Sequence, residues 1–463
     1  MISSSTHPTQ GSSYKLSPSQ QWKYFSQPRA MHEWLRDRYG NLARLHFQGR
    51  EYALVITPEA ARQVFSADPD GYDAFWKESF AGLTGGSDSV WVLIREPHRR
   101  ERLLFAPAVH ANHFRLYGEV IRDTVRLHLE NWRPGREIKA IDTTRAMALD
   151  VIMRLAFGVE EEDLMDKGRE ILEELRSAVH PLIVFYPKLQ RNWFPLWRRY
   201  ARARQAMYAW VDRLLAVRRS KGGGAMDVLG SLINSQDETG APATDEHIRV
   251  ELNSVLGAGH ETTAVALAWA LYELGSHPDV LEKLRAELEG MGGEPDAGMI
   301  HTLPYLDAIF KETVRLHPIL AECARVPMEP LEILGQTIPA GTALVVSIVG
   351  IHHDPVLYPE PDRFRPERFL ERSYDVFEFL PFGGGHRRCL GAGLAEYSMK
   401  IALAEIATHW DFETAAADVD ARNDIAMGPK HGVRLRILGR REPKWRVALP
   451  AEMETASLGA ERI

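Results

Sequence analysis

"PFGGGHRRCLGAGLAE", residues 381–396, is the stretch of sequence that decides the fold. It holds Cys389, one of only two cysteines among 463 residues, between paired arginines and a glycine. Apolar residues recur after it at helical spacing, which predicts an amphipathic helix that begins just beyond the cysteine. A helix N-terminus presents unpaired N–H groups and a partial positive charge. With Arg387 and Arg388 beside it, this environment favours the thiolate form of Cys389.

Spacing excludes other glycine-rich sites. A P-loop ends in Gly-Lys-Ser/Thr and a dinucleotide fingerprint is G-x-G-x-x-G after a strand, and neither pattern is present. A zinc ion or an iron–sulfur cluster needs several soft ligands, whereas the only other cysteine, Cys323, lies far upstream. Cys389 is therefore either the single thiolate ligand of one metal or a buried structural cysteine.

The pattern F-x-x-G-x-R-x-C-x-G, from Phe382 to Gly391, resembles the haem-binding loop of the cytochrome P450 family. The resemblance implies that Cys389 is the axial ligand of the iron of haem b, iron protoporphyrin IX. Glycine N–H groups are implied to hydrogen-bond the sulfur, and Phe382 to pack near it. The implied fold is mainly α with small β-sheets (α+β): a single large cytochrome P450 domain, with haem buried between a long central helix and the cysteine-loop helix.

The long helix is predicted from Asp245 to Gly275 with Thr244 as its cap, and it would span roughly 45 Å. Its middle, A-G-H-E-T-T from Ala258, contains glycine and threonine, which predict a kink in a buried helix. The same residues resemble the oxygen-binding groove of the family, where the helix opens locally. Thr262 is thereby implied to hydrogen-bond bound O2, and Glu261 to serve a proton relay through water.

Two further motifs precede the cysteine loop in the order found in the family. Glu312 and Arg315 of an E-x-x-R motif are one helical turn apart, and PERF follows with Arg368. An exposed helical pair contributes only about 0.3–0.5 kcal/mol. The resemblance instead implies a buried three-membered ion network behind the haem that holds the thiolate loop in place, and breaking it would leave unpaired buried charge.

Haem carries two carboxylates, which must be paired if they are buried. His98 and Arg102 lie four residues apart in HRRER, Arg325 lies in a strand-like segment, and Arg387 precedes the cysteine. These four residues resemble the positions that hold the propionates in the family. The alternative for HRRER is a solvated basic helix face, which we expect for the Arg99–Arg100 pair.

The rest of the chain predicts a mostly helical organisation. Helical patterns dominate before residue 240, and short strands are predicted at 43–47, 52–56, 333–338 and 343–348. We expect three parts: a disordered arm at residues 1–20, a haem domain at 21–440 and a tail at 441–463.

Composition limits the partners and the compartment. The chain is 45% hydrophobic and 26% charged with a net charge of −7, which argues against nucleic acid as a partner. No basic segment followed by an apolar run opens the sequence, and the apolar run TALVVSIVGI is shorter than the roughly 20 residues of a membrane span. Two cysteines without a framework fit a reducing compartment. We expect a soluble cytoplasmic protein without a membrane anchor.

The resemblance implies a haem-thiolate monooxygenase that inserts one oxygen atom from O2 into an organic substrate, as in hydroxylation. No flavin or clustered-cysteine pattern is present, so electrons are expected from a ferredoxin or flavodoxin with an NAD(P)H-dependent reductase. Arg99, Arg100 and Arg388 predict a basic surface for an acidic ferredoxin. The alternatives are a haem-thiolate peroxygenase or isomerase, and a non-catalytic haem sensor.

The segments that line the substrate pocket in relatives are mostly apolar here. They contain Phe80, Trp91, Phe185, Leu256, Ile319, Leu320, Glu322 and Met427. This wall predicts a sizeable apolar substrate of terpenoid, steroid, fatty acid or polyketide type. The alternative is that many of these aromatic residues only pack helices together. Glu322 is the exception, because a carboxylate there must find a partner, face solvent or bind a polar group of the ligand.

Overall fold

The computed structural model describes residues 13–47, 49–105, 114–222, 227–236, 240–294, 296–415, 421–423 and 426–444. The arm expected at residues 1–20 lies outside them up to residue 12. Its remainder is folded, because Tyr14–Lys15 forms a strand and a helix begins at Pro18. The tail expected at 441–463 lies outside the described residues from 445 onward.

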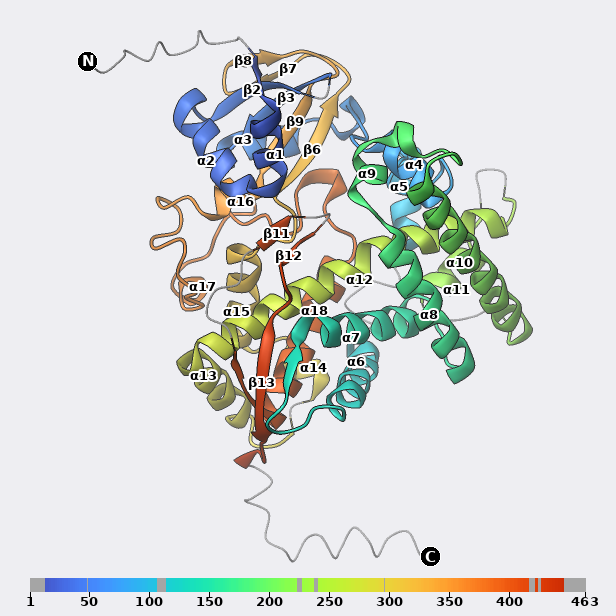
Figure 1. Ribbon diagram of the computed structural model, residues 1–463, viewed down its shortest axis with the longest axis vertical. Coiled ribbons are helices and arrows are strands. Elements are labelled where there is room, and N and C mark those ends of the chain that lie inside the picture. Colours follow the sequence, from blue (N-terminus) through green and yellow to red (C-terminus); the bar gives the residue numbers. More distant parts are fainter. Residues whose placement is uncertain are drawn as a thin grey trace, which may run out of the picture.

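Helices dominate the fold, as predicted (Figure 1). They are α1 (Pro18–Ser26), α2 (Pro28–Tyr39), α3 (Pro58–Ser66), α4 (Lys77–Thr84), α5 (Arg95–Phe105), α6 (Phe114–Leu129), α7 (Ala140–Leu155), α8 (Glu162–Ala178), α9 (Pro181–Phe185), α10 (Pro195–Ser220), α11 (Val228–Ile233), α12 (Asp245–Ser276), α13 (Pro278–Glu289), α14 (Ala297–Ile300), α15 (Pro304–Leu316), α16 (Ile348–His352), α17 (Arg368–Glu371) and α18 (Ala392–His409). In the part of the chain that is described, no helix combines the length and the apolar composition needed to cross a bilayer.

The sheets are small. The largest has the strand order β1-β2-β3-β9-β6-β4, a second has the order β10-β13-β5, and β7-β8 and β11-β12 are two-stranded. The strands are β1 (Tyr14–Lys15), β2 (Leu42–Phe47), β3 (Arg50–Val55), β4 (Tyr72–Asp73), β5 (Glu137–Lys139), β6 (Glu322–Pro327), β7 (Leu331–Ile333), β8 (Gln336–Ile338), β9 (Ala343–Ser347), β10 (Trp410–Thr414), β11 (Ala421–Asn423), β12 (Met427–Pro429) and β13 (Arg434–Arg440).

One predicted strand is wrong. Residues 333–338 form a turn and the two ends of a hairpin, because β7 and β8 pair antiparallel on either side of Leu334 and Gly335. Both turn residues have positive φ, 49° and 71°, as a tight hairpin turn requires. The other three predicted strands match β2, β3 and β9 to within two residues.

Helix α12 forms the centre of the molecule (Figure 1). It begins where predicted, and the Thr244 side chain accepts a hydrogen bond from the His247 N–H at 3.2 Å. Its second half is buried nearly all round, with Trp269 at 1% exposure, among α7, α15 and α18. Its first half packs with α7, α8, α10 and α11 in a second apolar cluster. The helix therefore belongs to both large cores of the protein.

Candidate active site

The cysteine loop is held tightly against α3. Gly385 has a φ of 65°, and a Cβ on it would lie 2.9 Å from the carbonyl oxygen of Phe65. A Cβ on Gly384 would lie 2.5 Å from the Phe65 ring. The Cys389 N–H donates to the Phe382 carbonyl at 3.0 Å, which closes the loop. Glycine is required here because any side chain would push the loop away from α3.

Cys389 lies between this loop and α18, which begins at Ala392 as predicted. Its side chain is exposed, yet enough protein surrounds it that burial is the largest effect on its pKa. The N–H of Gly391 hydrogen-bonds the sulfur.

The expected thiolate environment needs correction. The Gly391 N–H and the charges of Arg388 and Arg102 lower the pKa of Cys389, but burial outweighs them and the net pKa is raised. The helix end and the arginines were recognised correctly, but desolvation depends on packing that the sequence does not show. Since metal coordination deprotonates a thiol outright, the raised pKa does not oppose ligation.

The middle of α12 is accessible, although its flanking turns are buried. Gly257 is exposed and Ala258 is partly exposed, and a Cβ on Gly257 would meet no atom within 4 Å. A Cβ on Gly391, beside the cysteine, would likewise meet no atom within 4 Å. Leu390 packs on the apolar cluster to which Leu256 belongs, which connects the loop to the α12 core. Small residues thus leave open space along both elements.

The two residues expected to handle protons have protein partners. The Thr262 hydroxyl donates to the Ala258 carbonyl at 2.6 Å, and α12 runs uninterrupted, so the expected local opening is not seen. The Glu261 carboxylate pairs with Arg145 of α7, with 2.9 Å between Oε2 and Nε. Arg145 was not predicted, because nothing local in the sequence marks a partner more than a hundred residues away.

Three arginines and a histidine converge near the cysteine. His98 and Arg102 come from α5, Arg325 from β6, and Arg387 from a short 3-10 turn at Gly385–Arg387. Burial, with Arg325 and Arg102, lowers the pKa of Arg387 to about 10. Burial, with Arg387 and Arg102, lowers the pKa of His98 to about 3. The structure therefore brings together all four residues expected to hold carboxylates.

The three arginines have no anionic partner in the described part of the chain. Arg325 donates to the Gly384 carbonyl at 2.6 Å and Arg102 to the Arg388 carbonyl at 3.0 Å. Arg387 donates to the Leu93 carbonyl, and its buried Nε has no hydrogen-bond partner. Buried positive charge of this kind attracts an anion.

The residues present fit a haem group. An accessible thiol, open space beside small residues, and cations without carboxylate partners match an iron ligand, a flat macrocycle and two propionates respectively. His386 was not predicted to take part. Its ring lies 5.8 Å from that of His98, and burial with Arg325 lowers its pKa to about 4. Its position inside the cysteine loop is the signal that could have identified it.

The structure also brings the expected ion network together. Arg315 contacts Glu312 at 2.7 Å, and Arg368 contacts the same carboxylate at 2.9 Å. All three side chains are at most 2% exposed. Arg315 also donates to the His352 and Pro361 carbonyls, at 2.8 and 2.9 Å. Every described charge of the network therefore has a partner.

The residues expected to line the substrate pocket fall into two groups. Phe80 stacks on Trp91 at 4.4 Å, and Phe80, Phe185 and Leu256 belong to the apolar cluster of α7, α8 and α10. The Met427 N–H donates to the Ile319 carbonyl at 2.8 Å, which joins β12 to the segment before β6. Leu320 is 46% exposed.

Glu322 binds protein groups. The Tyr24 hydroxyl donates to its Oε2 at 2.7 Å, and His32 Nε2 lies 3.2 Å from the same atom. The hydroxyl makes a well-formed hydrogen bond, whereas the His32 contact has the distance of an ion pair without hydrogen-bond geometry. Of the three alternatives for Glu322, the structure shows that it has protein partners, which join β6 to α1 and α2.

The basic surface expected near the site is smaller than predicted. Arg99 pairs with Asp70 at 2.6 Å and with Glu96 at 2.9 Å, so its charge is compensated. Arg388 is exposed and lies over the Phe382 ring at 5.8 Å. No carboxylate of the described residues pairs with it.

Comparison with known proteins agrees with this geometry. The family model described as Cytochrome P450 matches residues 16–433. Cytochrome P450 135A1 of Mycobacterium tuberculosis is 33% identical over 89% of this chain and 90% of its own length. Cytochrome P450 138 of Mycobacterium bovis is 32% identical over 86% of this chain and 89% of its own length. The solved structure of cyanobacterial CYP120A1 with retinoic acid bound has a TM-score of 0.80 and 24% identity, covering 90% of this chain and 96% of its own.

The chain therefore belongs to the cytochrome P450 family, whose members are haem-thiolate monooxygenases. The predicted fold class is confirmed by this structural likeness.

Proposed function

We propose that this protein inserts one oxygen atom from O2 into a sizeable apolar substrate, with Cys389 as the axial ligand of haem b. The observation that carries the proposal is the accessible thiol of Cys389 beside Arg102, Arg325 and Arg387, which have no carboxylate partner among the described residues. The chemistry that haem supplies when bound is reductive activation of O2 at iron, with the second oxygen atom leaving as water.

The residues of the chain bind and orient this group. Cys389 Sγ would ligate the iron, and the N–H of Gly391 would stabilise the negative charge on sulfur. His98, Arg102, Arg325 and Arg387 would pair with the propionates, whose negative charge offsets the burial that lowers the pKa of each of these groups.

The residues of α12 would deliver protons. Glu261 is 28% exposed and bound to Arg145, so its carboxylate is both oriented by the protein and accessible to solvent. The Thr262 hydroxyl donates its proton to the Ala258 carbonyl, so its oxygen is left to accept a hydrogen bond from a water molecule of the proposed relay. The accessible strip at Gly257 and Ala258 is where the substrate and O2 would fit.

We propose an apolar substrate of terpenoid, steroid, fatty acid or polyketide size. Phe80, Trp91 and Phe185 are partly exposed aromatic residues beside the α12 core, which supports an apolar wall. Retinoic acid, bound by the cyanobacterial neighbour, is a lipophilic molecule of this size class. Electrons would come from a ferredoxin or flavodoxin with its NAD(P)H-dependent reductase. Both cysteines are free, which accords with a cytoplasmic location.

The test uses Cys389→Ser and its matched control Cys323→Ser. Reduced wild type and Cys323→Ser under carbon monoxide should show the far-shifted Soret band of a thiolate-ligated haem, and Cys389→Ser should lose it. With a surrogate ferredoxin and reductase, the wild type should convert an apolar library member that shifts its resting spectrum. Identical spectra for the two variants would overturn the ligand assignment. Conversion with peroxide alone, and none with O2 and reductant, would overturn the monooxygenase assignment.

A further inference from the structure

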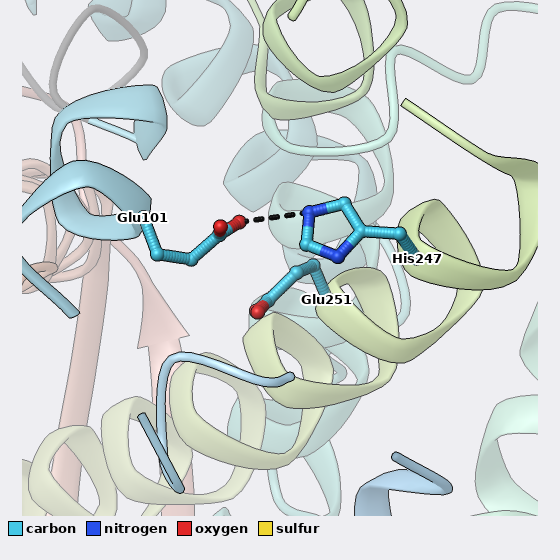
Figure 2. Close-up of side chains that lie close together, drawn as sticks. All are labelled: Glu101, His247 and Glu251. Atoms are coloured by element: carbon cyan, nitrogen blue, oxygen red, sulfur yellow. Dashed lines mark hydrogen bonds and ion pairs between the residues drawn. The ribbon is translucent and has the colours of Figure 1, made fainter. Parts of the chain in front are cut away.

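A second polar cluster lies on α5 and α12, apart from the residues assigned to haem. Glu101 comes from α5, and His247 and Glu251 are one turn apart on α12 (Figure 2). Figure 2 shows the three side chains converging, with Glu101 facing His247 across the gap between the helices. One ligand atom from each side chain lies within 4.8 Å of the other two.

The contacts of the cluster leave one buried oxygen atom, on Glu251, without a hydrogen-bond partner. His247 Nε2 lies 3.0 Å from Glu101 Oε1, and the Val90 N–H donates to Glu251 Oε1 at 2.7 Å. Glu251 is fully buried at 0% exposure, and its Oε2 has no hydrogen-bond partner. A buried carboxylate oxygen without a partner destabilises the fold. It needs a proton or a cation.

From this geometry we propose that Glu101, His247 and Glu251 form a binding site for one divalent transition-metal ion, for which Zn²⁺ is the natural probe. Two carboxylates balance the charge of the ion, and imidazole with carboxylate suits zinc better than magnesium or calcium. Zinc–ligand bonds of about 2.0–2.2 Å require only small rotations of side chains that already lie within 4.8 Å.

Protons compete with the metal at this site. The hydrogen bond to Glu101 raises the pKa of His247 to about 9, and burial raises the pKa of Glu251 well above its usual value. A ligand must lose its proton before it binds a metal. Metal affinity should therefore rise with pH.

A bound metal would join two functional helices. α5 carries His98 and Arg102, and α12 carries Ala258 and Thr262. The ion would thus stabilise the position of the propionate-binding helix relative to the oxygen-binding helix. It lies outside the proposed chemistry, and its test does not depend on turnover.

The test is zinc titration of the haem-loaded, untagged full chain after removal of metal with a chelator, followed by calorimetry and thermal unfolding. The wild type should bind one Zn²⁺ per chain at pH 8, and its unfolding temperature should rise by roughly 2 °C or more at saturating metal. Glu251→Gln and His247→Gln should each weaken binding by more than about tenfold. Glu246→Gln, which changes an exposed acid one residue from His247, should bind like the wild type.

Two outcomes would overturn the proposal. One is a wild type that binds no zinc at pH 8. The other is equal binding by Glu246→Gln, Glu251→Gln and His247→Gln, which would place the metal elsewhere. Should Glu251→Gln fail to fold, His247→Gln and Glu101→Gln with an intact carbon monoxide spectrum make the same comparison.

Discussion

At the scale of single residues, the Thr262 hydroxyl is the group on which efficient oxygen transfer should depend. It lies on the accessible strip of α12 and donates to the Ala258 carbonyl at 2.6 Å. Its neighbour Thr263 lies on the same helix with similar exposure and has no assigned role. The two threonines form a matched pair, because each substitution removes the same atoms from the same helix.

We expect Thr262→Ala to bind haem and substrate normally. The amount of product formed per electron consumed should fall by about tenfold or more, because the hydroxyl that helps to deliver protons to the activated oxygen is missing. The consumed O2 should appear as hydrogen peroxide, measured with an oxygen electrode and a peroxide assay. Thr263→Ala should couple like the wild type, and Thr262→Ser should restore much of the yield. Wild-type coupling in Thr262→Ala would remove Thr262 from the proton path.

Arg368 offers a second prediction about a single side chain. Arg368→Ala leaves the Glu312 carboxylate and Arg315 buried with one cation missing, which should lower the free energy of unfolding by about 3–5 kcal/mol. Arg363→Ala removes an exposed arginine that pairs with Glu360, so its effect should stay within about 0.5 kcal/mol. Denaturant unfolding and haem retention measure both variants. Equal stability of the two would show that the buried network does not hold the structure.

At the scale of elements, α16 connects the ion network to the cysteine loop. His352, at the end of α16, is fully buried, and its Nε2 accepts a hydrogen bond from the Leu380 N–H at 2.8 Å. Its carbonyl accepts from Arg315. Burial, with the charges of His353 and Arg315, holds the pKa of His352 well below its usual value. The ring is therefore neutral in the folded protein.

This arrangement predicts a loss of stability in acid. The unfolded chain takes up a proton on His352 below about pH 6.5, whereas the folded chain does not, so stability present above that pH is lost as the pH falls. One such group contributes up to about 1.4 kcal/mol per pH unit. His352→Gln keeps an acceptor for Leu380 but does not titrate, and its unfolding free energy should fall less between pH 7.5 and 5. His301→Gln, at an exposed histidine, should follow the wild type. Parallel curves for the wild type and His352→Gln would contradict this explanation.

The elements and the site differ in how far the sequence predicts them. α12 and the start of α18 follow from local signals: the Thr244 cap, the apolar periodicity and the glycines around Cys389. The hairpin of β7 and β8 was missed because its turn places Leu334 at a positive φ, a backbone conformation that a leucine does not signal. The turn geometry is visible only as backbone angles.

Partners far apart in the sequence were the main omissions at the site. Arg145 for Glu261, Tyr24 for Glu322, and Glu101 for His247 are each brought together by tertiary packing. No motif spans these separations. Burial likewise reversed the predicted shift of the Cys389 pKa, because desolvation depends on the whole surrounding structure.

At the scale of the whole molecule, the charge next to the cysteine loop should control electron delivery. The net charge is −7, yet Arg388 is exposed beside Cys389, while Arg99 is compensated by Asp70 and Glu96. A local positive charge on an acidic protein favours docking of an acidic ferredoxin in one orientation.

We expect reduction by an acidic ferredoxin to slow as salt rises, since the Debye length is about 10 Å at 0.1 M ionic strength. Arg388→Glu should slow it further at low salt, whereas Arg99→Gln should change it little. Stopped-flow reduction under carbon monoxide gives the rates. A rate independent of salt, or one unaffected by Arg388→Glu, would move the docking surface elsewhere.

The largest sheet has a consequence for biosynthesis. β3 pairs in parallel with β9, and Tyr52 meets Ala343, roughly 290 residues later in the chain. At about 5–20 residues per second, a ribosome needs roughly 15–60 s to make that stretch. During this time β3 has an unpaired edge, because the strand that covers it has not yet been made. The first strands to leave the ribosome are thus among the last to be completed, and the nascent chain needs protection from aggregation while it waits.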